Sequence, residues 1–467
     1  MTQTSSIWRR DASLVVSSCV IVALIVGMLL GAPALHLVGA ALFLLIAGTY
    51  AALLHPSAIL RLLAFTLAAV PLMPMPGLGV PVFLLLGIAV WVAVLVRPGQ
   101  SLHFGAVEIV IVILGIAGFI SVVATGLTHT AFSEYGRWLI ATAVVIPMRR
   151  FTVRELATFG RTYVIGACAG GFVGIFLVFF DSSGRILASL GVLGYDPKGG
   201  NARVVVGSTF STLRLTGTYV DPNLAGIMLV VGLVLAVALF HGPWRTVIVL
   251  LLGLAIALTL SRTALGTVFA SAVLLLLFGR IGRRFRRRVL LGLAAAVVVA
   301  LSLVPVRSRL FDTFGPTDTG SLARREALDS FVSSMQGHWY FGQGWGIEEF
   351  HDATVAATAN YVANAPLLTI YRAGTFVGIA FVMMLICGVF LSVRQLRGGS
   401  WPGSVVGAGF IAFVVVALQL DFPVVILSPA TMAFGILLGF VAHPQVQDVA
   451  DLVPRRRPVA ARTKVAA

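Results

Sequence analysis

The segments LVVSSCVIVALIVGMLL (14–30) and FLLLGIAVWVAVLV (83–96) are apolar runs without a charged residue. A helix that crosses a bilayer needs about 20 such residues, and its backbone polar groups must pair internally because lipid offers them no partner. Strands of a membrane barrel would alternate apolar and polar residues, which these runs do not. They predict transmembrane helices, and therefore an all-α, polytopic integral membrane protein.

Similar runs recur along the 467-residue chain, in which 59% of the residues are hydrophobic and 11% are charged. Soluble domains are about 25% charged, so this chain has too few polar side chains to cover soluble domains of its size. We predict one transmembrane domain over 1–442 with about fourteen helices of roughly membrane-spanning length. The expected spans are 12–30, 34–54, 58–75, 80–96, 106–125, 135–148, 161–180, 222–240, 246–260, 262–279, 289–305, 366–393, 403–421 and 423–442. The pair 246–260 and 262–279 is either a tight re-entry or two short spans.

The net charge of +16 gathers in short segments between the apolar runs. That distribution follows the positive-inside rule and differs from the basic face of a nucleic-acid-binding protein, so the bilayer is the expected partner and nucleic acid is not. A cytoplasmic N-terminus places both GRIGRRFRRR (279–288) and PRRRP (454–458) inside. Both termini are then cytoplasmic, and 443–467 is expected to be a disordered basic tail.

Two long segments, 181–221 and 306–365, are extracytoplasmic loops on this map, and loops of such length usually have a function. Within the second, SLARREALDSFVSSM (321–335) has helical spacing of apolar residues and predicts a surface helix at the outer interface. The glycine spacing of the following GQGWG (342–346) predicts a tight turn. A dinucleotide fingerprint is not expected, because the segment does not follow a strand.

Basic residues on the outer side are informative because the positive-inside rule disfavours them there. Four lie close to or inside apolar spans, where a charge is costly and marks a function or a buried partner: Arg137, Arg214, Arg262 and Arg372. Each could simply pair with Glu134, Asp221, Asp421 or lipid headgroups. If several converge on one outer cavity, an anionic ligand such as a diphosphate becomes the better interpretation, because arginine binds phosphate oxygens in pairs.

Acidic residues and a histidine follow the glycine-rich turn, at Glu348, Glu349, His351 and Asp352. Such a group can hold a general base, or it can be a solvated loop. A single histidine with flexible acids lacks the defined geometry of a metal site, so we expect neither a metal nor another cofactor.

Three blocks in order resemble the O-antigen ligase and O-antigen polymerase superfamily of bacterial membrane glycosyltransferases. They are RLTGTYVDPNLAG (214–226), LTLSRTALGTVFA (258–270), and RREALDSFVSSMQGHWYFGQGWGIEEF (324–350) followed by ANAPLLTIYRAGTFVG (363–378). The similarity covers about residues 200–380. It implies a GT-C-like fold in the bacterial inner membrane and a metal-independent glycosyl transfer on the outer side.

In that family the donor is a polyprenyl-diphosphate-linked glycan, and the acceptor is a sugar hydroxyl on a second lipid or glycan. The resemblance implies that Arg214 and Arg262 hold the diphosphate and take part in catalysis, since fixed cations offset the charge of the leaving group. The other residues expected to bind substrate are Arg137, Asn223, Arg324, Arg325, Asn364 and Arg372.

One position departs from the family pattern. Where the ligases have His-Asn, this chain has Ala363-Asn364. Another group then acts as the base, with His351, Asp352, Glu349 and Asp221 as candidates, or the chemistry is polymerase-like and relies on arginines, or activity is lost. A polymerase or a divergent ligase is favoured. The alternatives from other classes are a transporter or flippase of a lipid-linked glycan and a non-catalytic envelope assembly partner.

Overall fold

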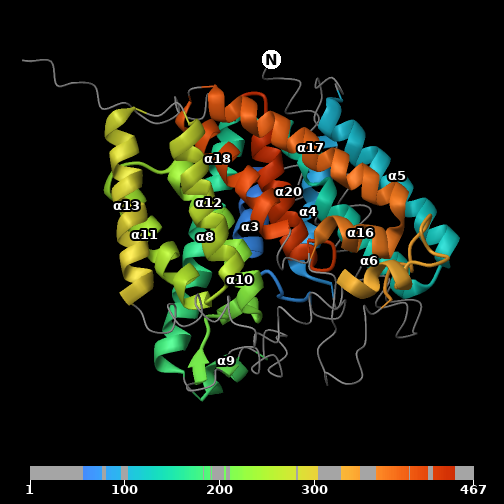
Figure 1. Cartoon of the computed structure of the whole chain (residues 1–467), viewed down its shortest axis with the longest axis horizontal. Helices are drawn as coiled ribbons and strands as arrows, with labels where there is room; N and C mark the ends of the chain where they lie inside the picture. The colour runs from blue at the N-terminus through green and yellow to red at the C-terminus, as the bar shows by residue number, and fades with distance from the viewer. Residues whose placement is uncertain are drawn as a thin grey trace, which may run out of the picture.

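The computed structural model describes residues 56–75, 80–95, 104–181, 183–189, 191, 204–206, 211–279, 282–302, 328–347, 364–398, 400–418 and 424–446. Over these residues the chain is helical apart from one short β-hairpin and the connecting turns (Figure 1), which confirms the all-α prediction for the described part. The helices are α3 (Pro56–Ala69), α4 (Val82–Leu95), α5 (Ala106–Thr125), α6 (His129–Ala143), α7 (Val145–Met148), α8 (Val153–Phe180), α9 (Arg185–Ser189), α10 (Pro222–Leu239), α11 (Gly242–Thr259), α12 (Arg262–Phe278), α13 (Arg283–Ser302), α16 (Ala365–Ala373), α17 (Thr375–Arg397), α18 (Trp401–Ala412) and α20 (Ser428–Ala442).

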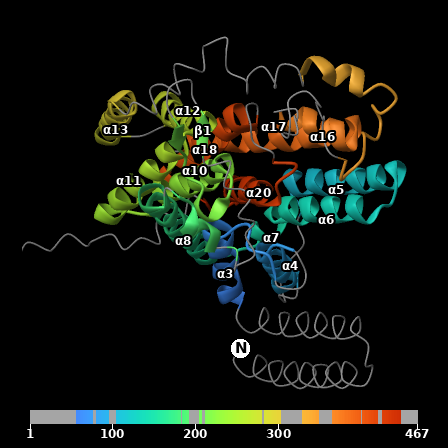
Figure 2. The same cartoon turned by 90° about the horizontal axis from the view of Figure 1, so that it is seen from below.

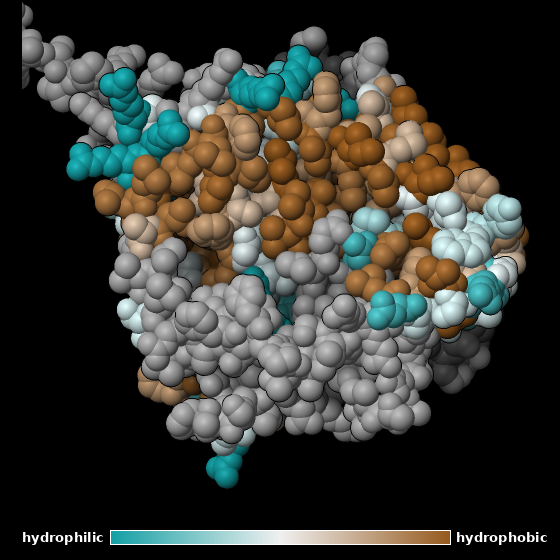
Figure 3. Space-filling model, in the orientation of Figure 1, coloured by the Kyte–Doolittle hydropathy of each residue, from teal (hydrophilic) through white to brown (hydrophobic). Residues whose placement is uncertain are grey.

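Five helices in the described part of the chain are long and apolar enough to cross a membrane, namely α5, α8, α10, α11 and α17. Large apolar side chains remain exposed on several of them, including Ile116, Phe172 and Phe390. On the face that Figure 3 shows, apolar residues form a broad hydrophobic band with hydrophilic side chains along its upper edge. Lipid is the solvent that such a band requires, and the chain is a membrane protein.

Contacts between helix termini show which termini lie together at each end of the bundle. At one, which we call the basic end, Arg149 pairs with the buried carboxylate of Glu108 at the start of α5. The indole Nε1 of Trp401 donates to the carbonyl of Val237 there at 2.9 Å. The start of α18 therefore lies against the finish of α10.

At the opposite end, which we call the Arg214 end, the start of α10 meets the finish of two other helices. Tyr219 donates its hydroxyl to the carbonyl of Ala68 in α3, at 2.8 Å. The amide of Leu215 donates to the carbonyl of Leu258 in α11, also at 2.8 Å. Successive helices α10 and α11 thus run in opposite directions, as the sequence-based span map expects.

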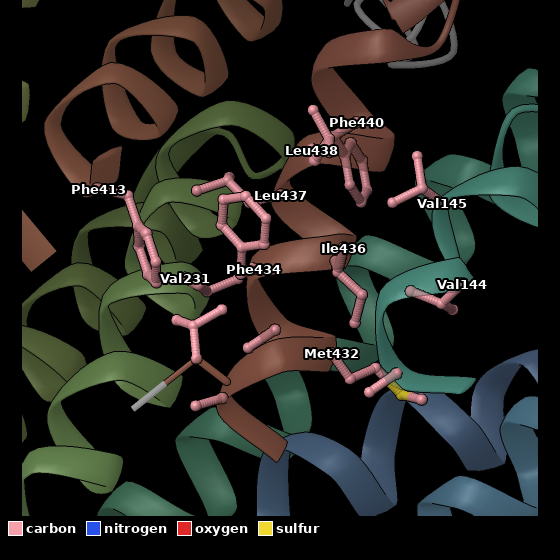
Figure 4. Packing of buried hydrophobic residues seen from close by; sticks show 14 of the residues in the cluster. Val144, Val145, Val231, Phe413, Met432, Phe434, Ile436, Leu437, Leu438 and Phe440 are labelled. Atoms are coloured by element: carbon pink, nitrogen blue, oxygen red, sulfur yellow. The ribbon is translucent and has the colours of Figure 1, made fainter. Parts of the chain in front are cut away.

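Helix α20 lies in the centre of the bundle and is buried on all sides. Figure 4 shows Phe434 and Leu437 pointing toward Phe413 and Val231, while Ile436 points toward the segment that carries Val144. Each of these α20 side chains is at most 1% exposed. Helices in a bilayer associate through close van der Waals packing and not through removal from water, so these interdigitated side chains hold α20 in the bundle.

Several sequence-based expectations differ from the structure. The expected single span 366–393 is two helices, because the chain breaks at Gly374 between α16 and α17. The segment after α8 contains an antiparallel pair, β1 (Val204–Val206) with β2 (Ser211–Leu213), which was not predicted. Helix α8 begins at Val153, eight residues before the expected 161.

Other predictions lie partly or wholly outside the described residues. The spans 12–30 and 34–54, and the tail beyond Val446, are among them, so the count of fourteen is untested. Of the expected surface helix 321–335, only 328–335 is described, and it is helical over 328–334. The ambiguous pair 246–260 and 262–279 is two helices, α11 and α12, joined by a turn.

Candidate functional site

Arg214 follows β2 and joins two helices at the Arg214 end. Its Nε donates to the carbonyl of Thr259, the last residue of α11, at 2.9 Å. Its Nη2 donates to Oδ1 of Asn223 in the first turn of α10, at 3.1 Å. The guanidinium is therefore held from two sides in a fixed orientation, which the planar fork of arginine allows and the single ammonium of lysine does not.

Asn223 has its place because α10 begins abruptly. Asp221 is the N-cap, and its Oδ1 accepts from the backbone amides of Asn223 and Leu224, each at 2.8 Å. Pro222 occupies the first helical position, where its missing N–H costs no hydrogen bond. Asp221, a candidate base in the sequence, thus uses a carboxylate oxygen to cap a helix.

Arg262 is the first residue of α12, directly after the N-cap Ser261. The second turn of α10 packs on this start: a Cβ built on Gly226 would lie 2.8 Å from Cβ of Ala264 and 3.3 Å from Cβ of Ser261. The N-termini of α10 and α12 therefore lie together. Arg214 is close to them, because it donates to the carbonyl of Thr259, three residues before Arg262. Helix N-termini carry partial positive charge and favour anions, so charge and geometry here suit a phosphate group.

Two backbone positions at this site are strained. Among the described residues, only Val220 (φ 63°) and Leu260 (φ 51°) have positive φ without being glycine. Asp221 N donates to Tyr219 O at 2.7 Å across Val220, whose ψ is −46°. This hydrogen bond closes the rare, strained γ-turn. Each strained residue immediately precedes the N-cap of α10 or α12, and such strain concentrates at functional sites in proteins.

A second group of predicted residues surrounds the break between α16 and α17. Arg372 lies in the last turn of α16 and is 6% exposed. Asn364 is the N-cap of the same helix, and its Oδ1 accepts from the amide of Leu367 at 3.0 Å. The side chain expected to bind substrate therefore also begins the helix that carries Arg372.

The predicted glycine-rich turn packs directly on this helix. Gln343 N donates to Tyr371 O at 2.7 Å, and Gly344 N donates to Arg372 O at 3.0 Å. A Cβ on Gly342, whose φ is 78°, would lie 2.5 Å from the carbonyl carbon of Arg372. Only glycine satisfies both the backbone angle and the close approach, so the turn and Arg372 form one rigid unit.

The same turn is held on its other side by α5 and α6, which lie alongside α16 and α17 (Figure 2). Ser121 of α5 donates its hydroxyl to Phe341 O at 2.7 Å. Trp345 is 2% exposed, and its ring centroid lies 4.8 Å from that of Trp138 and 5.6 Å from that of Tyr135, both in α6. Neither Ser121 nor this aromatic cluster was predictable from the sequence, because the contacts join segments about 200 residues apart.

Arg137 is also in α6, where its Nη1 lies 3.2 Å from Oε1 of Glu134. This pair is one of the alternatives that the sequence left open. Its two side chains are 35% and 28% exposed, so the ion pair is neither fully buried nor fully solvated. The adjoining Trp138 contacts the turn residue Trp345, which places Arg137 near the Arg372 unit.

The structure thus assembles two groups at the same end of the bundle. Arg214, Asn223 and Arg262 form the first, and Arg372 with Asn364 forms the second. Between the two groups no hydrogen bond is found within the described ranges. His351, Asp352, Arg324 and Arg325, with Ala363 and Glu349, lie outside the described residues. No cluster of three or more His, Cys, Asp or Glu that could hold a metal occurs in the part of the chain that the structure describes.

Comparison with known proteins gives one result. A family model described as O-antigen ligase matches residues 246–382, from the first turns of α11 into α17. The matched segment contains Arg262, the glycine-rich turn and Arg372, and its residue Thr259 holds Arg214. No curated protein matches the chain. The match supports the resemblance that the sequence blocks indicated: residues 246–382 of this chain are similar to the O-antigen ligase family.

Proposed function

We propose that the protein transfers a saccharide from a polyprenyl-diphosphate carrier to a sugar hydroxyl, as a polymerase or ligase of envelope polysaccharide. The observation that carries the proposal is the Arg214 group, in which a fixed guanidinium lies beside the joined N-termini of α10 and α12. The setting is a GT-C-like bundle of about fourteen spans, in the bacterial inner membrane with both termini cytoplasmic. The Arg214 end then faces outward.

In the proposed reaction the acceptor oxygen bonds to the anomeric carbon of the donor sugar while the bond from that carbon to the diphosphate oxygen breaks. The electron pair of the broken bond leaves with the diphosphate, and the acceptor proton goes to a base. Negative charge grows on the leaving diphosphate, and preorganised positive groups stabilise it most where they need not reorient. Arg214 is preorganised in this sense because Asn223 and Thr259 hold it.

Arg262 supplies the second cation from the first position of α12. The helix dipole of α12 adds to its charge, since the dipole's positive pole is at the same residue. Fixed charges of this kind replace the role that a metal has in many phosphate-handling enzymes, which is why the proposal is metal-independent. For the base, His351, Asp352 and Glu349 remain candidates.

Product chain length in cells tests the proposal. Arg214→Ala and Arg262→Ala should each lower product formation about 10²–10³-fold, the usual effect of removing one transition-state donor. Arg185→Ala is the control, because Arg185 is an exposed arginine of α9 on the same side. Unchanged polymer in both site variants at normal protein level would refute the assignment.

A cationic site could equally serve a transporter of lipid-linked glycan, or a non-catalytic assembly partner that has lost the family histidine at Ala363. Reconstituted vesicles separate these functions. The enzyme alters labelled donor lipid supplied on one side, a transporter moves it across unaltered, and an assembly partner does neither.

A further inference from the structure

Four aromatic residues beside the Arg372 unit are left facing outward. We call them the aromatic surface: Trp339 (40% exposed), Tyr340 (69%), Phe341 (41%) and Phe376 (57%). Tyr340 and Phe376 stack with ring centroids 6.2 Å apart and an interplanar angle of 26°. Burial of rings this size is strongly favourable, so their joint exposure indicates a binding surface.

The aromatic surface continues directly into the apolar face of α17. C-terminal to Phe376 along α17, apolar side chains are exposed at three- and four-residue intervals on one side of the helix: Ile379, Met383, Ile386 and Phe390. Such a stripe on a spanning helix faces hydrocarbon. Figure 3 shows the corresponding border, where the brown band gives way at lower right to a mixture of pale, teal and brown side chains.

The aromatic surface is rigidly attached to the bundle. The amide and hydroxyl of Thr375 both donate to Trp339 O, at 2.8 and 2.7 Å. Trp339 also contacts Phe331 edge-on, with ring centroids 6.1 Å apart. The four rings therefore cannot move away from α17 without breaking the contacts of the turn.

We propose that the aromatic surface docks on the lipid headgroup layer and sets the depth of the glycine-rich turn and Arg372. Tyrosine and tryptophan concentrate at the membrane interface, because each has an apolar body and one polar group. The surface lies where the hydrocarbon-facing stripe ends, which is the place of that layer. A glycan-stacking platform would also use Trp and Tyr, but Phe341 and Phe376 offer a glycan no hydrogen bond. This proposal does not depend on the proposed enzymatic function.

The depth of Tyr340 can be measured directly. In a variant with Cys19, Cys168 and Cys387 replaced by alanine, Tyr340→Cys carries an environment-sensitive fluorophore in vesicles of anionic and zwitterionic phospholipid. Gln336→Cys is the matched control, an exposed polar residue of the same segment. Shallow nitroxide lipids should quench the Tyr340 probe, and aqueous iodide should quench it several-fold less than the Gln336 probe.

Equal iodide quenching at the two positions would overturn the proposal. Protection of the Tyr340 probe by added oligosaccharide in detergent, without lipid, would indicate glycan binding instead. Disulfide-linked dimers of Tyr340→Cys in the membrane would indicate a second copy of the chain. Because these quenching and crosslinking readouts report position, they stay valid if the chain proves not to be a glycosyltransferase.

Tyr340→Glu and Tyr340→Trp add a functional test. The carboxylate should lift the surface from anionic headgroups and reduce product formation several-fold, whereas tryptophan should retain it. Equal loss in both, at normal protein level, would show that Tyr340 has a role other than docking.

Discussion

The guanidinium of Arg214 donates from Nη2 to the side-chain oxygen of Asn223, 3.1 Å away. The bond links a residue after β2 to the first turn of α10, and its acceptor is a neutral amide. A neutral partner orients Arg214 without cancelling its charge. We therefore expect Asn223 to position Arg214, in addition to the substrate binding that the sequence predicts.

Asn223→Asp tests this distinction. The carboxylate keeps the hydrogen bond and, near the start of α10, favours the helix dipole, so thermal stability in detergent should not fall. Product formation should fall further than in Asn223→Ala, for which about tenfold is expected from one lost hydrogen bond. A stable Asn223→Asp protein with wild-type activity would contradict the role of Arg214 as a diphosphate ligand.

Arg214→Lys separates charge from orientation. Lysine keeps the positive charge but cannot bond Thr259 O and Asn223 Oδ1 together in one plane. We expect about a 10²-fold loss in product formation, measured as labelled polymer from isolated membranes. The control is Arg185→Lys, which should leave polymer unchanged because Arg185 is exposed. Full activity of Arg214→Lys would mean that the geometry around Thr259 is unimportant.

The strained turn at Val220 predicts that glycine is more stable than alanine at this position, the reverse of the usual order. Gly is usually less stable than Ala by about 0.5–1 kcal/mol inside regular structure. At φ 63° the Cβ of alanine is unfavourable, so Val220→Gly should be more stable than Val220→Ala by about 1 kcal/mol. Thermal denaturation of the two variants gives this difference, and both lose most of the same apolar contacts. Alanine as the more stable variant would show that the turn relaxes.

Gly374 predicts a steric effect at the break between α16 and α17. Its φ is 87°, and a Cβ there would lie 2.0 Å from Tyr340 O. Gly337 has a similar φ of 82° but nothing within 4 Å of its Cβ position. Gly337→Ala should therefore cost only about 1–2 kcal/mol of backbone strain, whereas Gly374→Ala should cost several times more, measured as loss of thermal stability. Similar costs would mean that, in the membrane-embedded protein, the backbone at Tyr340 does not pack against Gly374.

Much of the fold is predictable because apolar length is a strong signal. Helix α5 matches the expected span 106–125 at both bounds, and the break between α11 and α12 falls at Ser261 as expected. The break at Gly374 was missed because mostly apolar residues continue on both sides of it, over 367–371 and 376–391. What decides it is a contact with Tyr340, and sequence periodicity carries no information on contacts between separate segments.

The candidate site was partly predictable for the same reason. Arg214, Arg262 and Arg372 are recognisable because charge is costly in an apolar setting. Sequence could not show that Asn223 orients Arg214 or that Asn364 caps α16, since an asparagine gives the same letter in either role. Val220 and Leu260 gave no signal at all, because both are ordinary apolar residues and only their backbone angles are unusual.

Two contacts of α5, the Glu108–Arg149 ion pair and the Ser121–Phe341 hydrogen bond, differ in when they can form during synthesis. Glu108 and Arg149 are 41 residues apart, so this ion pair can form as soon as α7 has emerged. Ser121 and Phe341 are 220 residues apart, and contacts so distant in the chain form late. The glycine-rich turn therefore docks on a bundle that has already assembled, and a chain truncated before Phe341 would keep α5–α12 but lack both the turn and the helix α16 that carries Arg372.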